Sequence, residues 1–185
     1  QLAVGAHEDK SQQTTITNGS TAATDNTATI GAVFVYTRDD TSSWSQQAYI
    51  KASNAQQTAF GARYFGFNIS LENNTLAVGS AGDASNQTTI TNGTSSSSNT
   101  SKGAAGAVFV YTRSGTDWSQ QAYIKASNSD SGDIFGYAIA LSGDTLAVGA
   151  QAEDSNQTSI TNGSTSSGDN SASFSGAVYI YTRSG

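Results

Sequence analysis

The sequence has no cysteine, no proline and no methionine, and it has a single histidine among 185 residues. Without cysteine there is no disulfide and no thiolate metal site, although this absence does not fix the compartment. The one histidine, His7, begins a loop whose other two copies have none, and no G-x-S-x-G elbow or phosphate-binding loop occurs. The sequence therefore predicts no enzyme, with no catalytic, cofactor-binding or metal-ligating residues.

Charge is also scarce, since only 12% of the residues are charged and the net charge is −6. The few lysines and arginines are dispersed, whereas nucleic-acid binding usually requires a basic patch. The longest apolar runs, such as GAVFVY, are far shorter than the roughly 20 residues of a membrane-spanning helix. We expect neither a nucleic-acid partner nor membrane insertion.

The dominant feature is an internal repeat of about seventy residues. The word LAVG begins at Leu2, Leu76 and Leu146, so its offsets are 74 and 70 residues. The words GAVFVYTR, WSQQAYIKASN and FG recur in the same order around it. The chain therefore contains about two and a half copies of one supersecondary unit.

Each unit is expected to contain four short strands. Residues 135–141, 145–150 and 176–183 would be the first three, and residues 44–53 show the fourth in an earlier copy. These runs are rich in Val, Ile, Phe and Tyr and are bounded by Gly, Asn, Asp and Ser. The sequence predicts an all-β chain of four-stranded antiparallel blades, in a β-propeller or an open stacked repeat array.

The repeat divides the chain into three blades of unequal completeness. Residues 1–59 hold the second to fourth strands, residues 60–130 a complete blade, and residues 131–185 the first three strands. The chain is expected to be a window on a longer array, or to assemble end to end with further copies. In both cases open strand edges would pair with further repeats or with another copy.

The order FG, TLAVGA, GAVYIY and Trp resembles the FG-GAP repeat of integrin α-subunit propellers and their bacterial and algal relatives. Calcium-binding members carry an Asp-rich loop between the first two strands. Here those connections, residues 71–76 and 141–146, have one acidic residue each, Glu72 and Asp144. The resemblance therefore implies the fold without the metal, because calcium needs six to eight oxygen ligands.

The loop between the second and third strands is written almost identically three times, as QTTITNGST, QTTITNGTS and QTSITNGST. Its isoleucines, Ile16, Ile90 and Ile160, are candidates for an interaction surface that packs against the neighbouring copy. The Asn-Gly pair predicts a hairpin turn, and the same Asn begins a glycosylation sequon. The candidate glycosylation sites are Asn18, Asn86, Asn92, Asn99, Asn156 and Asn162.

Two further groups of residues recur at equivalent places. Acidic residues follow the second strand at Asp9, Asp83, Glu153 and Asp154, where they would cap the loop or contribute to a cation site. Trp44 and Trp118 begin the fourth strand, where they would pack between blades or offer a sugar-stacking platform. In each case we expect the structural role.

These features predict a non-enzymatic, extracellular or cell-surface repeat module with a structural or adhesive role. It would belong to a larger surface glycoprotein or to a self-assembling filament. The alternative is a ligand-binding β-propeller that recognises glycans or a protein partner through the long loops between the second and third strands.

Overall fold

The computed structural model describes residues 1–55 and 63–184. Every regular element in these residues is a β-strand, and none of them forms a helix that could span a membrane. The strands form three antiparallel sheets. The predicted all-β class with blade-like sheets is confirmed, and the sheets close no barrel.

The first sheet has the order β1-β3-β4-β2, and the middle sheet has the order β5-β6-β8-β9-β7. Their strands are β1 (Leu2–Ala6), β2 (Thr17–Asn18), β3 (Ala32–Arg38), β4 (Trp44–Ile50), β5 (Phe65–Glu72), β6 (Thr75–Ser80), β7 (Thr91–Asn92), β8 (Ala107–Ser114) and β9 (Asp117–Ile124). The third sheet has the order β10-β11-β12, with β10 (Phe135–Ser142), β11 (Thr145–Ala150) and β12 (Ala177–Thr182).

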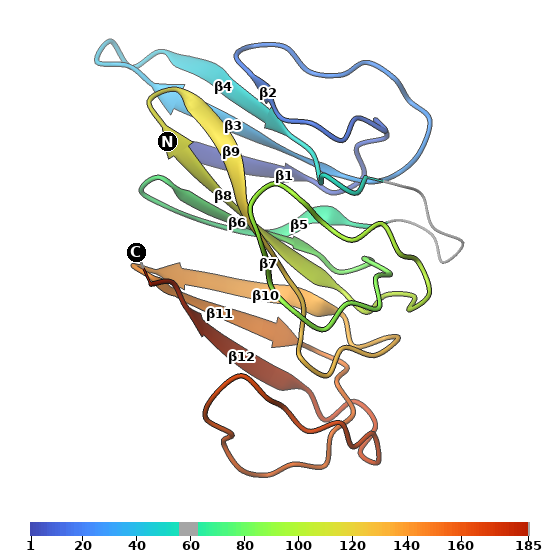
Figure 1. Cartoon of the computed structure of the whole chain (residues 1–185). Helices are drawn as coiled ribbons and strands as arrows, with labels where there is room; N and C mark the ends of the chain where they lie inside the picture. Colours follow the sequence, from blue (N-terminus) through green and yellow to red (C-terminus); the bar gives the residue numbers. More distant parts are fainter. Residues whose placement is uncertain (56–62, 185) are drawn as a thin grey trace.

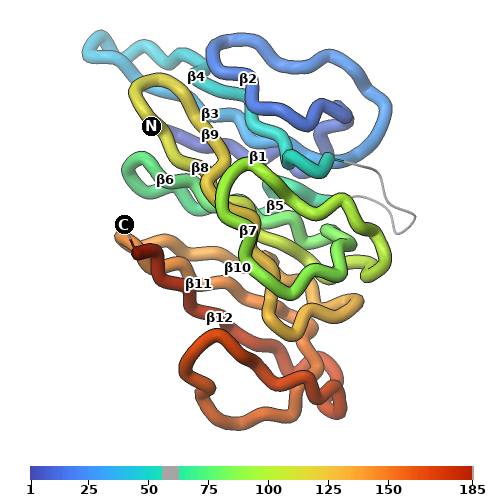
Figure 2. The backbone as a smooth tube through the Cα atoms, in the orientation of Figure 1, coloured from blue at the N-terminus to red at the C-terminus, as the bar shows by residue number. Residues whose placement is uncertain are grey.

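The three sheets lie face to face and follow one another in chain order, with the middle sheet between the other two (Figure 1). Both termini lie on the same side of this stack (Figure 2). Because the middle sheet is covered on both faces, both sides of its strands are apolar. Leu76, Ala77 and Val78, successive residues of β6, are all fully buried.

The words FG and GAV meet where one sheet contacts the next. Phe65 forms a parallel bridge with Gly31, and Phe135 forms the same bridge with Gly106. A Cβ atom at Gly106 would collide with the backbone of Phe135, and Gly106 has a φ of +83°. Glycine is therefore required for the backbones of adjacent sheets to approach this closely.

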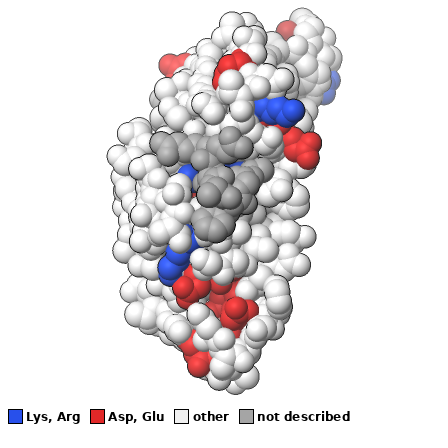
Figure 3. All heavy atoms as spheres, turned by 90° about the vertical axis from the view of Figure 1, so that its right-hand side faces the viewer, with Lys and Arg blue, Asp and Glu red and all other residues white. Residues whose placement is uncertain are grey.

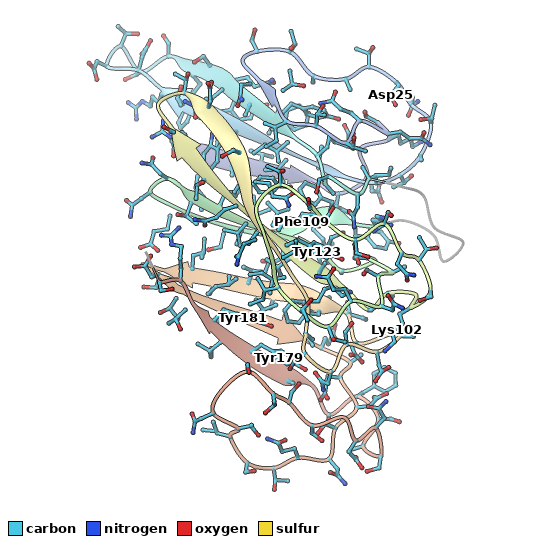
Figure 4. All side chains as sticks on the ribbon, viewed as in Figure 1. Asp25, Lys102, Phe109, Tyr123, Tyr179 and Tyr181 are labelled. Atoms are coloured by element: carbon cyan, nitrogen blue, oxygen red, sulfur yellow. The ribbon has the colours of Figure 1, made fainter. Side chains whose placement is uncertain are left out.

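Aromatic side chains fill the space between sheets. Phe65 and Phe109 of the middle sheet pack edge-on, with ring centroids 5.4 Å apart, in the core cluster that the sheet shares with the first one. Phe135 and Tyr179 pack in the same way within the third sheet, in the cluster shared with the middle one. Figure 4 shows Phe109 in the middle sheet and Tyr179 in the third. Trp118 reaches the first sheet, where its Nε1 donates to Gln47 Oε1 at 3.0 Å. Trp118 is buried, as the packing role predicts, whereas Trp44, at the same repeat position in the first sheet, is 53% exposed.

The loop that recurs between the second and third strands of each unit does not form the predicted two-stranded hairpin. Its Thr-Asn pair instead joins the outer edge of the sheet, where Thr17 and Asn18 pair with Tyr49 and Ala48 of β4. Thr91–Asn92 pairs with β9 in the same way. The prediction of an Asn-Gly hairpin was wrong because backbone partners on the outer strand were available to the segment.

Candidate functional site

The first candidate site is a buried acidic residue that follows the second strand of each unit. Asp83, in the middle sheet, is fully buried, and its two oxygens accept bonds from four side chains. Its Oδ2 accepts from Arg63 Nη1 at 2.6 Å and from Asn54 Nδ2 at 2.8 Å. Its Oδ1 lies 2.9 Å from Tyr123 Oη and 3.4 Å from Lys125 Nζ.

Burial governs the ionisation of the groups around Asp83. Desolvation lowers the pKa of Lys125, and the Asp83 carboxylate opposes this shift. Desolvation also raises the pKa of Tyr123 well above its usual range. A buried charge is tolerated only when it is paired and hydrogen-bonded. The hydrogen-bonded network around Asp83 therefore links residues that lie far apart in the chain.

The first sheet contains a simpler version of the same centre. Asp9 Oδ1 accepts from Tyr49 Oη at 2.8 Å and from Lys51 Nζ at 2.9 Å. It also accepts from the backbone N–H of Ser11, as Asp83 does from Ser85. The expected capping of the loop by these acidic residues is thus what the geometry provides.

The third sheet also has an acidic residue at this place, but the side chains around it differ from those in the other two sheets. Glu153, which is buried, accepts from Asn128 Nδ2 at 2.8 Å and from the N–H of Ser155. Asp133 stands where the middle sheet has Arg63, and burial raises its pKa to about 6. Acidic side chains also gather on the surface towards this end of the stack (Figure 3). The third centre therefore carries excess negative charge.

The described part of the chain contains no group of three or more His, Cys, Asp or Glu side chains placed to hold a metal ion. His7 lies beside exposed aromatic rings, 5.5 Å from that of Phe67, and its Nε2 is 3.9 Å from Glu8 Oε1. Neither arrangement provides a general base next to a nucleophile.

The second candidate site is the repeated loop, whose internal bonds are the same in all three copies. In the first copy Gln13 Nε2 donates to Thr15 O and to Thr17 Oγ1, both at 2.8 Å. Gln87 and Gln157 make the equivalent pairs of bonds. These bonds set the loop conformation in each copy, including the third, where Thr161 and Asn162 have no strand to pair with among the described residues.

The three loop isoleucines differ in exposure according to what lies beside them. Ile16 is partly buried against the core cluster that contains Trp118 of the next sheet. Ile90 is 48% exposed and Ile160 is 89% exposed. Exposure thus rises towards the third sheet, and their use as an interaction surface stays a prediction.

All six candidate glycosylation sites lie on exposed loop residues or short edge strands, but their side-chain amides make different hydrogen bonds. The side chain of Asn18 is held against the middle sheet, where its Oδ1 accepts from the N–H of Trp118 at 3.0 Å. Asn156 Nδ2 donates to Ser171 Oγ at 2.9 Å. The remaining sites are Asn86, Asn92, Asn99 and Asn162.

The third candidate site is a groove of about 480 Å³ between the middle and third sheets. It opens beside β12, and its lining includes Ile90, Asn92, Gln121, Leu146, Tyr181 and Arg183. Both aliphatic and hydrogen-bonding side chains are therefore present in it. This groove could not be predicted from the sequence, because it depends on how two sheets are stacked.

Sequence reasoning also missed the basic partners of the acidic centres. Lys51 and Lys125 occupy the same position of the repeat, as do Asp9 and Asp83. These pairs could have been predicted from the recurrence of one acidic and one basic residue at fixed positions of the repeat. Arg63 has no counterpart of its kind in the third unit, so no repeat pattern pointed to it.

Comparison with curated proteins finds no significant match to this sequence. Residues 118–181, which run from β9 to β12, match the family model for the FG-GAP repeat. Repeats of this family are in general structural or binding modules, and they typically occur in extracellular or surface proteins. The matched segment includes the FG word at Phe135, whose backbone forms the bridge with Gly106 of the middle sheet. The match thus agrees with the suspected resemblance to the FG-GAP repeat.

Proposed function

We propose that the chain is a non-enzymatic structural module whose stack of sheets is extended by further copies of the same repeat. The observation that carries this proposal is that equivalent apolar residues are buried inside the stack and exposed at its ends. Leu76 of β6 is fully buried, whereas its equivalent Leu2 is 45% exposed. Val108 of β8 is fully buried, whereas its equivalent Val178 is 71% exposed.

The two ends expose opposite faces of the same unit. Leu2 and Val4 lie on the face that, in the middle sheet, packs against the preceding sheet. Val178 and Ile180 lie on the face that, in the middle sheet, packs against the following one. Contacts between unlike faces do not close on themselves in pairs; they generate a ring where the rotation between units closes and an open filament where it does not. The assembly that we propose is the open one, an extended surface protein or a fibre.

Changing Val178 to Asp is expected to abolish association of the chain, because a carboxylate in a sheet interface would be desolvated without a partner. Sedimentation velocity over a range of concentrations, with electron microscopy, measures the effect. Ser98→Asp adds the same charge in an exposed loop and should leave association unchanged. A parent chain that stays monomeric at about 1 mM, a weak-binding limit, would contradict assembly through these faces.

The module is further proposed to be an extracellular or cell-surface glycoprotein. Its support is the repeat family and the exposed sequons at Asn86 and Asn99. After expression through a eukaryotic secretory route, glycopeptide mass spectrometry should find glycans on these two residues. Asn18 should stay unmodified, because its side chain is hydrogen-bonded to the Trp118 backbone. Unmodified Asn86 and Asn99 would refute the proposal.

A further inference from the structure

The connection from β9 to β10, residues 129–134, bonds to the loops of both the middle and the third sheet. On one side, the N–H of Ile134 donates to Ala104 O at 3.0 Å, in the long loop of the middle sheet. On the other side, Asp133 O accepts from the N–H of Ala152 at 3.2 Å, in the loop after β11. The 129–134 connection therefore ties the two sheets to each other outside their strands.

The side chain of Asp130 strengthens this tie from both sides. Lys102 Nζ, from the middle sheet's loop (Figure 4), donates to Asp130 Oδ1 at 2.7 Å and to the Ser129 carbonyl. Asn170 Nδ2, from the third sheet's loop, donates to Asp130 Oδ2 at 3.1 Å. Desolvation alone would raise the pKa of Asp130, but the bonds from Lys102 and Asn170 lower it. Asp130 therefore stays charged at neutral and mildly acidic pH.

The side chain of Asp133 is the unfavourable member of the same connection. It is buried, and its Oδ2 accepts from the N–H of Asp130 at 2.7 Å. At the equivalent position of the middle sheet, Arg63 forms an ion pair with Asp83. No lysine or arginine within residues 1–55 and 63–184 forms an ion pair with Asp133. A buried carboxylate without a cation favours its protonated form.

The charged groups that face Asp133 act in the same direction. Desolvation raises its pKa to about 6, against the bond from the Asp130 N–H. The negative charges of Asp130, Glu153 and Asp154 add to the rise. Lys125 is the cation that interacts with Asp133, but its ammonium belongs to the acidic centre of the middle sheet. Asp133 therefore changes its charge near pH 6, whereas an ordinary aspartate does so near about 3.9.

Two other features make the connection easy to open. Ile134 has a φ of +57°, in the left-handed region that β-branched residues avoid. Ser129 Oγ is buried and has no hydrogen-bond partner in the part of the chain that the structure describes. Local opening relieves both of these costs and hydrates the Asp133 carboxylate. We therefore expect the 129–134 connection to open before the sheets unfold.

We propose that the 129–134 connection is a pH-sensitive clamp, which holds the middle and third sheets together when Asp133 is protonated and opens more readily when Asp133 is charged. A carboxyl that binds its proton more tightly in the closed form than in water stabilises the closed form as pH falls. The clamp therefore tightens as pH falls from about 7.5 to about 5. It acts within one chain, so it does not depend on the association of copies.

Amide hydrogen exchange of the whole chain measures this opening, when it is resolved by NMR and corrected for the intrinsic rate at each pH. Between about pH 7.5 and about pH 5, the opening constant of the Ile134 and Ala152 N–H groups should fall about tenfold. This factor follows from a pKa of about 6 in the closed clamp and about 3.9 in the open one. The N–H of Ile30, which donates to Asp9 O in the first sheet, should change little.

Two variants separate charge from shape. Asp133→Asn keeps an oxygen for the N–H of Asp130 but cannot ionise. Its opening constant at about pH 7.5 should be about tenfold lower than that of the parent and should not change with pH. Glu153→Gln removes one facing charge and should move the titration midpoint of Asp133, followed by the carbon-13 shift of its carboxyl, to lower pH.

Asp40→Asn is the control, because it removes an exposed carboxylate after β3 and should behave as the parent does. Circular dichroism checks that all three variants remain folded. Three results would overturn the proposal. They are a midpoint of Asp133 below about pH 4.5, exchange at Ile134 and Ala152 that follows pH as Ile30 does, and a pH dependence that survives in Asp133→Asn.

Discussion

Replacing Asp83 by alanine is expected to lower the free energy of unfolding by about 3–5 kcal/mol, the cost of removing one partner from a buried ionic centre. Lys125 and Arg63 would each lose a carboxylate that they contact in a fully buried environment. The Tyr123 hydroxyl and the Asn54 amide would lose an acceptor as well. Urea denaturation followed by tryptophan fluorescence measures the change.

The pH dependence of this penalty has a definite sign. Desolvation lowers the pKa of Lys125 in the folded state, and removing Asp83 takes away a group that opposes this shift. A lysine whose folded-state pKa is lowered destabilises the fold while the unfolded chain binds the proton. The deficit of Asp83→Ala should therefore shrink as pH rises from 7 towards 10. A deficit independent of pH would show that Lys125 is not the group left unpaired.

Asp9→Ala is the matched control, because Asp9 has the same repeat position but a partly exposed side chain and a single lysine partner. Its cost should be smaller, about 1–3 kcal/mol for one charge-assisted hydrogen-bonding site. Equal losses for the two variants would contradict the view that burial and the second cation make Asp83 the stronger centre.

Gly106→Ala is expected to cost more than about 3 kcal/mol, because both strain at positive φ and a backbone collision contribute. A Cβ atom there would meet the carbonyl oxygen and the nitrogen of Phe135, which are parts of the neighbouring sheet. Neither atom belongs to a flexible side chain that could move aside. The third sheet would have to shift away from the middle one, exposing the apolar faces between them.

Gly176→Ala separates the two contributions. Gly176 has the same repeat position and a φ of +73°, but the nearest atom to its Cβ position would be 3.3 Å away. This variant should lose only the strain term, about 1–2 kcal/mol. The difference between the two variants, measured by urea denaturation, isolates the contact between sheets. Similar losses at both positions would mean that the contact contributes little.

The repeat words allowed the strands and the fold class to be predicted because apolar alternation and bounding turn residues are local properties. The FG and GAV words marked the elements that meet between sheets, although sequence alone did not show that they touch each other. Trp118 packs between blades as expected, but Trp44 at the same repeat position is 53% exposed, because burial also requires a neighbouring sheet. These are features in which local propensity and global packing agree.

Other features could not be predicted because they depend on relations between distant parts of the chain. The segment around Asn18 has the composition of a hairpin turn, and only the nearby outer strand β4 makes pairing with that strand the better alternative. The network around Asp83 joins residues 20 to 42 positions away. The groove beside β12 requires the register of three strands and a loop to be known at once.

The short strands β2 and β7 affect the directions in which copies of the chain could associate. An open outer edge would present unpaired N–H and C=O groups to any neighbouring sheet and favour side-by-side joining. Thr17–Asn18 and Thr91–Asn92 occupy part of that edge on β4 and β9, and their loops continue beside it. If units stack as proposed, growth sideways is therefore hindered within each unit while growth along the stack is not. The proposed stacking would then give long, thin particles without lateral aggregation, although only 12% of the residues are charged.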